Sequence, residues 1–213
     1  GPNGCGKSTL LRAAARQLPL LQGGITLDGQ PIGDFSPKAY ARRVALLPQA
    51  RDVPAITVRQ LALHGRFPYL GFPRTPSKAD HAAVDAALEA AGVAGLRDAD
   101  LRQLSGGQRQ KAYLAMALSQ DAELLLLDEP TTFLDIQHQL ELLALIAGLP
   151  GQGKTVLMVL HDLDQALRVS DEVAVLQDGR LAFHGAPEAA YTAGILQEVF
   201  QVGVRRVTAG TPP

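Results

Sequence analysis

The sequence predicts an α/β domain with a mostly parallel sheet and a helical segment inserted into it. Apolar strand patterns alternate with amphipathic helix patterns along most of the chain, which is typical of βα units with parallel strands. The stretch 50–114 breaks this alternation, because it contains only helical and proline-rich patterns. With 46% hydrophobic and 19% charged side chains, the 213 residues can bury the core of one such domain.

The chain begins with nine residues that fit the phosphate-binding pattern G-x-x-x-x-G-K-[ST], namely Gly1, Pro2, Asn3, Gly4, Cys5, Gly6, Lys7, Ser8 and Thr9. Glycines let successive backbone N–H groups point at phosphate oxygens, and the helix starting near Lys7 directs its positive end at the same anion. Lys7 would contact the β and γ phosphates, and Ser8 would offer its hydroxyl to Mg²⁺. Chance gives this pattern in roughly one chain in a hundred, so a plain glycine turn before a helix remains an alternative at this point.

Residues 10–47 are predicted to form short helices and strands separated by turns. A helix over 10–18 follows the loop, with apolar residues spaced for one buried face. A short strand over 25–27 ends in the turn Asp28–Gly29. Ser36–Pro37 begins another helix, because serine is a good N-cap and proline fits the first helical position. The apolar strand 44–47 is expected to be buried on both faces.

The inserted stretch is expected to be helical. Thr57 begins a helix that runs to His64, and a loop rich in proline and aromatic residues follows over 66–73. The segment 77–80 fits a capping box, and the helix behind it carries an apolar stripe formed by Val84, Ala87, Leu88 and Ala91.

The remaining elements return to the alternating pattern. We expect strands over 123–127 and 154–160, a helix over 163–169, a hairpin with its turn at Asp178–Gly179, and terminal helices within 188–200. A helix over 136–149 is expected to bury the face formed by Ile136, Leu140, Leu143 and Ala144. Residues 208–213 are expected to fray.

Two acidic residues end a strand of four leucines. In a parallel sheet, ligands bind beyond the carboxyl ends of the strands, which is where Asp128 and Glu129 would lie. Asp128 would face Mg²⁺, and Glu129 would polarise the attacking water as a general base. A buried strand followed by a solvated acidic turn would also explain four leucines before Asp128 and Glu129. This explanation becomes the weaker one in a chain that also has a phosphate-binding loop.

A second anion cradle is predicted at Leu104-Ser105-Gly106-Gly107-Gln108. A serine hydroxyl and the free backbone N–H groups of a helix N-terminus can bind an anion there. Chance produces this string in on the order of a few in ten thousand chains. An ordinary N-cap would explain Ser105, but we expect it to explain neither the paired glycines nor Gln108.

With these motifs in order, the sequence resembles the ATP-binding subunits of ABC transporters. The resemblance covers nearly the whole chain and adds three residues to the motifs above, namely the Q-loop residue Gln49, the D-loop residue Asp135 and the switch histidine His161. It implies a P-loop NTPase core of the RecA-like type over 1–49 and 115–202. It also implies a helical subdomain over 50–114 that ends with the family's signature string, Leu104–Gln108, and a C-terminal tail over 203–213.

The resemblance implies an ATP hydrolase that uses ATP and Mg²⁺. Two copies would form a head-to-tail homodimer, with each ATP between the first nine residues of one copy and Ser105–Gln108 of the other, near Asp135. By the same resemblance, Glu129, His161 and Gln49 are catalytic, and Ser8, Gln49 and Asp128 surround the metal. The other four histidines, His64, His81, His138 and His184, have no ligand-like spacing and are interpreted as structural or solvated.

A finer resemblance is to importers of iron–siderophore complexes, haem and vitamin B12. It is carried by 65–69, 131–139 and 161–166, although Asp164 replaces a common asparagine and Lys111 a common arginine. It implies transmembrane permease subunits as partners, whose coupling helix the inserted stretch helps to receive, and a periplasmic or lipoprotein substrate-binding protein as an indirect partner. The location would be peripheral, on the cytoplasmic face of the bacterial inner membrane.

Composition excludes several other classes. A net charge of −1 gives no basic field for nucleic acid, and no apolar run approaches the ~20 residues of a membrane helix. The single cysteine, Cys5, can form no intrachain disulfide, which fits a reducing cytoplasm.

The sequence departs from the family at its start, because the strands that precede the P-loop, and the aromatic residue that stacks on adenine, are missing. We therefore expect residues 1–213 alone to be unstable or to bind ATP weakly. Two other functions stay open from the sequence: a soluble ABC ATPase acting on ribosomes or DNA, and a non-hydrolysing, nucleotide-dependent binding module.

Overall fold

The computed structural model describes residues 1–49 and 53–204, and the chain forms two compact units. The larger unit runs from Ser8 to His161, and the smaller unit combines Gly1–Lys7 with the segment from Asp162 onward. The start of the expected helical subdomain at 50–52 and most of the expected tail lie outside the described residues. The expected division into a core and a helical subdomain stays a prediction.

A three-stranded parallel sheet organises the larger unit. Its strands are β3 (Val44–Leu47), β4 (Leu124–Asp128) and β5 (Thr155–Val159), in the spatial order β3-β4-β5. Leu47 lies opposite Leu127, and Asp128 lies opposite Val159. Because all three strands run the same way, their carboxyl ends meet at one edge of the sheet.

Both faces of this sheet are covered, which explains the uninterrupted leucines of β4. On one face, Leu126 packs with Leu11 and Tyr40 from helices α1 (Lys7–Ala14) and α2 (Pro37–Arg43). On the other face, Leu125 and Leu127 join the larger core, to which helices α5 (Gly106–Ser119) and α6 (Ile136–Ala147) also contribute. Successive side chains of a strand point to opposite faces, so a strand buried on both sides must be apolar at every position.

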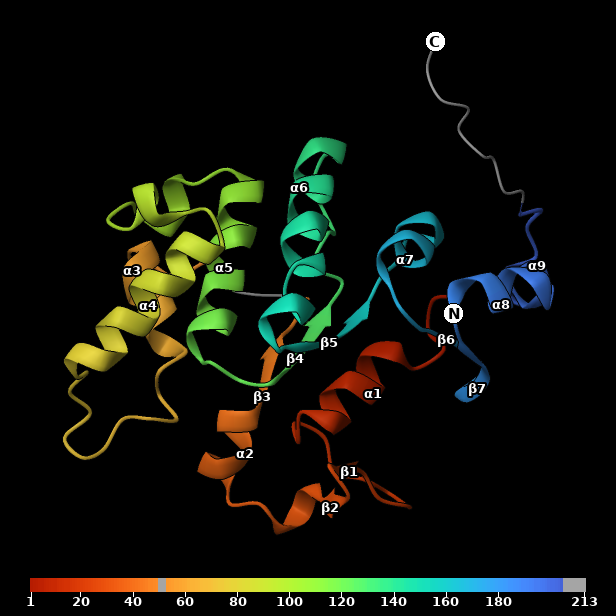
Figure 1. Cartoon of the computed structure of the whole chain (residues 1–213), viewed down its shortest axis with the longest axis horizontal. Coiled ribbons are helices and arrows are strands. Elements are labelled where there is room, and N and C mark those ends of the chain that lie inside the picture. The colour runs from red at the N-terminus through yellow and green to blue at the C-terminus, as the bar shows by residue number, and fades with distance from the viewer. Residues whose placement is uncertain (50–52, 205–213) are drawn as a thin grey trace. The chain divides into compact units, whose positions relative to one another are not determined.

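Beside the sheet, three helices pack against one another: α3 (Val58–His64), α4 (Lys78–Ala90) and α5 (Gly106–Ser119). Figure 1 shows this group in orange, yellow and green, and α5 also contacts β3. The predicted stripe of Val84, Ala87, Leu88 and Ala91 is buried. The connections include short 3₁₀ turns at Ala94–Leu96 and Leu101–Gln103.

Local capping signals place several helix starts where the sequence predicts them. Ser36 caps α2, and both Thr57 and Ser77 form complete capping boxes at the starts of α3 and α4. The helix after the first loop differs from the prediction, because α1 begins at Lys7 and ends at Ala14 rather than spanning 10–18. Arg16 adopts a positive φ of 59°, which interrupts helical geometry before Leu18.

The predicted buried face of the helix that follows β4 is wrong at three of its four residues, and only Leu143 is buried as predicted. Helix α6 (Ile136–Ala147) buries Leu142, Leu143 and Ile146, whereas Ile136 and Leu140 are 75% and 55% exposed and Ala144 is exposed too. Both faces of this helix are apolar, so periodicity alone could not choose between them. A 3₁₀ turn at Pro150–Gln152 follows before β5.

Before the sheet, a two-stranded hairpin of β1 (Thr26–Leu27) and β2 (Gln30–Pro31) turns at Asp28–Gly29 as predicted, and a 3₁₀ turn follows at Ile32–Asp34.

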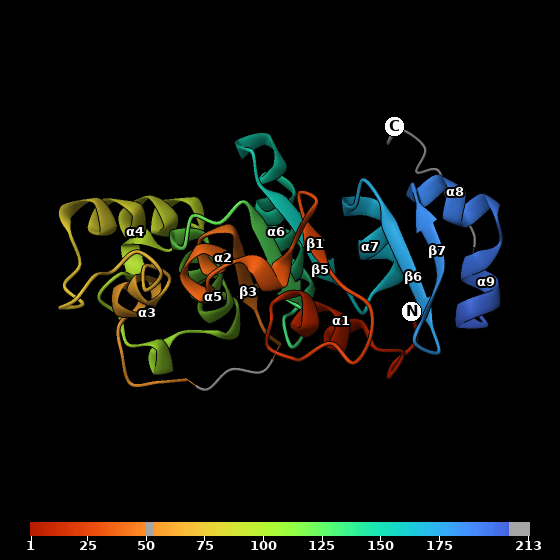
Figure 2. The same cartoon turned by 90° about the horizontal axis from the view of Figure 1, so that it is seen from below.

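The smaller unit is built on the hairpin of β6 (Val173–Gln177) and β7 (Arg180–Gly185). The turn lies at Asp178 and Gly179, as predicted, and both residues have positive φ, of 48° and 74°, as in the primed turns that suit two-residue hairpins. Helices α7 (Leu163–Val169), α8 (Pro187–Thr192) and α9 (Ile195–Phe200) contribute to the same small core (Figure 2).

Within the described residues, no helix is both long enough and apolar enough to cross a membrane.

Candidate nucleotide site

Polar residues follow each strand of the parallel sheet at its carboxyl edge. Gln49 comes two residues after β3, Glu129 comes directly after β4, and His161 comes two residues after β5. Asp128 is the last residue of β4 and is only 4% exposed, whereas Gln49 and His161 are exposed. The sheet therefore brings together four of the predicted site residues, from three separate parts of the chain.

A direct hydrogen bond joins the end of the phosphate-binding motif to the acidic strand end. The hydroxyl of Ser8, in the first turn of α1, donates to Oδ1 of Asp128 at 2.8 Å. These residues are 120 positions apart in the sequence. A hydroxyl and a carboxylate held side by side offer two oxygen atoms, which are the ligands that Mg²⁺ prefers.

The carboxylate of Glu129 is oriented by two donors. The side-chain amide of Gln49 donates to Oε2 at 2.6 Å, and the hydroxyl of Thr132 donates to the same oxygen at 3.1 Å. The backbone of Glu129 has a φ of 48°, and its N–H donates to the carbonyl of Val159 on β5 at 3.0 Å. A glutamate with a positive φ is uncommon, and here neighbouring groups hold both its backbone and its side chain.

The segment Gly1–Lys7 forms a tight loop around the amine of Lys7. Nζ of Lys7 donates to the carbonyl oxygens of Gly1 and Pro2, each at 2.8 Å, and lies 3.8 Å from the buried Sγ of Cys5. Gly4 and Gly6 have φ values of 78° and 100°, which glycine adopts without strain. The segment thus has a curled backbone that surrounds the amine of Lys7.

The signature string begins α5 with a capping box. The hydroxyl of Ser105 accepts from the backbone N–H of Gln108 at 3.2 Å, and Oε1 of Gln108 accepts from the backbone N–H of Ser105 at 3.0 Å. The expectation that an N-cap would leave Gln108 unexplained is therefore wrong, because Gln108 is the second half of that cap. The residues Ser105, Gly106 and Gln108 are exposed, and Gly107 is buried.

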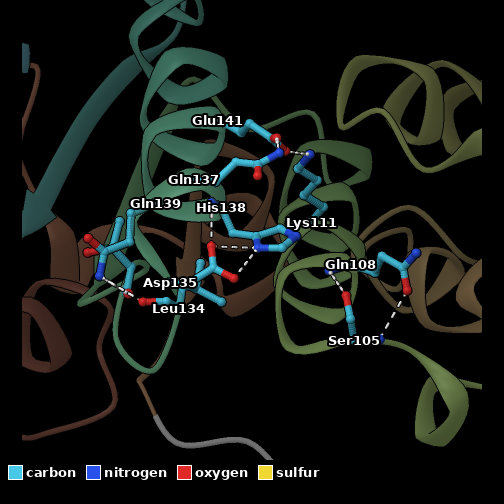
Figure 3. A network of polar contacts seen from close by, with 10 residues as sticks. Ser105, Gln108, Lys111, Leu134, Asp135, Gln137, His138, Gln139 and Glu141 are labelled. Carbon is cyan, nitrogen blue, oxygen red and sulfur yellow. Dashed lines mark hydrogen bonds and ion pairs between the residues drawn. The ribbon is translucent and has the colours of Figure 1, made fainter.

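Asp135 is the N-cap residue of α6. Its Oδ1 accepts from the backbone N–H of His138 at 2.9 Å, and its two carboxylate oxygens lie 2.7 and 2.8 Å from Nδ1 of the His138 ring (Figure 3). The backbone bond, followed by the ring contact, lowers the pKa of Asp135. A carboxylate at this position also complements the positive end of the helix.

A separate hollow of about 320 Å³ lies on the helical group. Its lining is largely apolar with cationic and amide groups among it, and consists of Ile56, Gln60, Leu63, His64, Phe67, Leu70, Arg74 and Pro76. Phe67 is half exposed there. This hollow falls within the stretch that the resemblance assigned to docking of a membrane subunit.

Three contacts were not predicted from the sequence. The hydroxyl of Thr132 donates to the carboxylate of Glu129, and the only sign of this contact in the sequence is that Thr132 follows Glu129 by three residues. Arg66 forms a buried ion pair with Asp80 at 3.0 Å. His138, interpreted as structural or solvated, packs against Gly107 of the signature string. The last two contacts join segments that are distant in the sequence, so they carry no local pattern.

Comparison with known proteins identifies relatives along the whole chain. Residues 1–132 match the family model described as ABC transporter. The ferric enterobactin transport ATP-binding protein FepC of Escherichia coli (strain K12) is 42% identical, over 100% of this chain and 80% of its own length. The hemin import ATP-binding protein HmuV of Nocardia farcinica is 45% identical, over 94% of this chain and 69% of its own length. A solved structure, described as an ABC transporter of the metal-chelate type in an inward-facing conformation, aligns with a TM-score of 0.82 and 28% identity over 94% of this chain and 76% of its own.

Proposed function

The chain belongs to the ABC transporter family and is an ATP-binding ATPase. We propose that it uses ATP hydrolysis to energise the import of a metal chelate. The class of cargo would be an iron–siderophore complex, haem or cobalamin. Relatives named for enterobactin, hemin and cobalamin transport support this class. The observation that carries the catalytic part of the proposal is the cluster of Ser8, Asp128, Gln49 and Glu129 at one edge of the sheet.

Glu129 is proposed as the general base for the attacking water. Its carboxylate is oriented by Gln49 and Thr132, so it needs little reorganisation when water arrives. Contacts made by the helical group would also affect the position of Gln49 beside Glu129, because Gln49 directly precedes that part of the chain. His161, at the end of β5, is proposed to reach the γ-phosphate.

The residues present fit a nucleotide with bound Mg²⁺. The described residues hold no cluster of three histidine, cysteine or acidic side chains, but Mg²⁺ on a nucleotide needs only one or two protein oxygens in addition to phosphates. Ser8 and Asp128 would supply those oxygens, with Gln49 beside them. When bound, Mg²⁺ would neutralise charge on the phosphates, and Lys7 and the backbone N–H groups of the first loop would hold the remaining oxygens.

Two copies of the chain are proposed to enclose each ATP. One copy would contribute its first nine residues, and the other would contribute Ser105–Gln108 with Asp135 nearby. The exposed first turn of α5 supports this arrangement, since its serine, glycine and glutamine are open to a ligand at a helix N-terminus. One chain would thus hold two phosphate cradles because they serve two different nucleotides.

The hollow beside Phe67 is proposed to receive a helix of a transmembrane permease subunit. An apolar hollow with a basic group at its edge suits an amphipathic helix, and Phe67 and Leu70 offer aromatic and aliphatic surface. The stretch 50–114 is proposed as the subdomain that carries this contact. The protein would then lie on the cytoplasmic face of a bacterial inner membrane, and a substrate-binding protein on the other side would act on it only through the permease.

Reconstitution tests this function. The full-length protein would be placed in proteoliposomes with its permease partner, and ATP turnover and uptake of chelated radioactive iron or cobalt would be measured together. We expect uptake to require ATP and to fall with the turnover of a Glu129→Gln variant. Turnover stimulated by ribosomes or DNA, with no membrane protein captured, would contradict the proposal.

A further inference from the structure

We infer that His138 is a positioning residue, which fixes the signature turn to the D-loop of the same subunit. This inference rests on the proposed function, because it concerns how the Ser105–Gln108 cradle is presented to a nucleotide held by a second copy. It assigns a role to a residue whose sequence context suggested none.

The ring of His138 occupies space that only a glycine leaves free. A Cβ placed on Gly107 would lie 2.2 Å from Cδ2 of His138. Gly107 is buried, and the side chain of His138 is only 33% exposed. The second glycine of the signature string is therefore required by a contact within the subunit, as well as by any ligand that approaches the turn.

The opposite edge of the same ring is held by the D-loop. Nδ1 of His138 lies within hydrogen-bond distance of both carboxylate oxygens of Asp135. The imidazole thus contacts Asp135 on one side, as Figure 3 shows, and Gly107 on the other. Displacement of the D-loop would move the ring, and the ring cannot move toward α5 without displacing the signature turn.

Two further contacts join the same pair of segments. The side-chain amide of Gln110, on α5, donates to the carbonyl of Pro130, directly after Glu129. One turn along each helix from His138 and Gly107, the ammonium of Lys111 donates to Glu141 at 2.7 Å, with only 19% of the lysine side chain exposed. Gln137 donates to the other oxygen of Glu141 at 3.0 Å, which orients that carboxylate.

Three contacts therefore join α5 to the segment from Pro130 to Glu141. Of these, His138 is the contact nearest the exposed cradle, since Gly107 is part of the signature string. We expect its loss to loosen the first turn of α5 and leave binding at the loop Gly1–Ser8 unchanged.

Two measurements on the full-length protein test this role. In a Glu129→Gln background, ATP-dependent dimer formation is followed by light scattering. In a second measurement, a fluorescent ATP analogue is titrated into the monomeric subunit to give its nucleotide affinity. We expect His138→Ala to raise the ATP concentration needed for half-maximal dimer about fivefold, the ratio that corresponds to losing one hydrogen bond. Nucleotide affinity of the separated subunit should change less than about twofold.

The controls separate positioning from general damage. His138→Asn keeps a donor near the place of Nδ1, and we expect it to restore most of the dimer formation. His184→Ala removes a comparable histidine–carboxylate pair in the other compact unit, between His184 on β7 and Glu172 just before β6, and should have no effect. Dimer formation by His138→Ala at the parent's ATP concentration would overturn the inference, as would an equal loss in His138→Asn or His184→Ala.

Hydrogen exchange gives an answer that does not depend on dimer formation. Without nucleotide, the amides of 105–112 should exchange about fivefold faster in His138→Ala than in the parent protein. Unchanged exchange there would overturn the inference. If exchange is faster in His138→Ala but the Glu129→Gln parent never dimerises with ATP, the positioning role of His138 stands and the proposed ATP-bound dimer is refuted.

Discussion

The buried ion pair between Arg66 and Asp80 offers a quantitative test of how the helical group is held together. Arg66 donates through Nε to Asp80 at 3.0 Å and through its guanidinium to the carbonyl of Ser119 at 2.9 Å, and both side chains of the pair are 9% exposed. Hydrogen bonds from the Ser77 side chain and backbone, followed by those from Arg66, lower the pKa of Asp80 from 3.8 to about 2. The pair thus connects the ends of α3, α4 and α5.

The lowered pKa sets the size of the effect. One pKa unit corresponds to about 1.4 kcal/mol, so ionised Asp80 contributes about 2–2.5 kcal/mol to the free energy of unfolding. Because the folded pKa lies below the unfolded one, this stability is complete above about pH 4 and is lost as the pH falls toward 2. We expect Asp80→Asn to cost about 2–4 kcal/mol at pH 7, since it also leaves the buried guanidinium of Arg66 without its counter-charge.

Urea unfolding followed by circular dichroism, at a series of pH values, measures this. Asp164→Asn is the matched control, because it removes an exposed pair with Arg168 and should change stability little. An Asp80→Asn protein as stable as its parent at pH 7 would refute the reasoning. A stability difference that stayed constant from pH 6 to the acid limit of folding would refute the pKa argument separately.

Three substitutions at the nucleotide site follow from the same structure. Glu129→Gln keeps the size of the side chain but removes the base, so steady-state ATP turnover should fall by about a hundredfold or more while ATP binding persists; undiminished turnover in a phosphate-release assay would remove the general-base role. Lys7→Ala removes the only lysine of the first nine residues, and ATP affinity measured by calorimetry should fall at least about tenfold, the scale of one charge-assisted hydrogen bond; unchanged affinity would contradict its place on the phosphates. Ser8→Ala removes the hydroxyl that contacts Asp128, and half-maximal turnover should need several times more Mg²⁺; an unchanged magnesium dependence would show that this oxygen is not a ligand.

Local chemistry made much of the fold predictable. Ser36, Thr57 and Ser77 each cap a helix, and Asp178–Gly179 forms the expected turn, because capping and turn geometry depend on a few adjacent residues. The strand-end cluster was predictable for a related reason. Once the strands are parallel, residues that directly follow them must meet at one edge.

Contacts between distant segments were not predictable. The orientation of α6 depends on which of two apolar faces finds partners, and the sequence favours neither. The hydrogen bond from Gln49 to Glu129 spans 80 residues and has no local signal of its own. The contact of His138 with Gly107 likewise depends on how α5 and α6 pack, so a histidine that looked incidental lies against the signature string.

The shared nucleotide is the central claim, and cysteine crosslinking between two differently tagged copies tests it most directly. In a full-length Cys5→Ala, Glu129→Gln background, one copy would carry Asn3→Cys and the other Ser105→Cys. With ATP and Mg²⁺, we predict that a short bifunctional reagent joins the two tags only when both variants are mixed, and that omission of ATP abolishes the product. Efficient joining of Asn3→Cys to itself, or no mixed product under conditions where ATP is bound, would contradict the account.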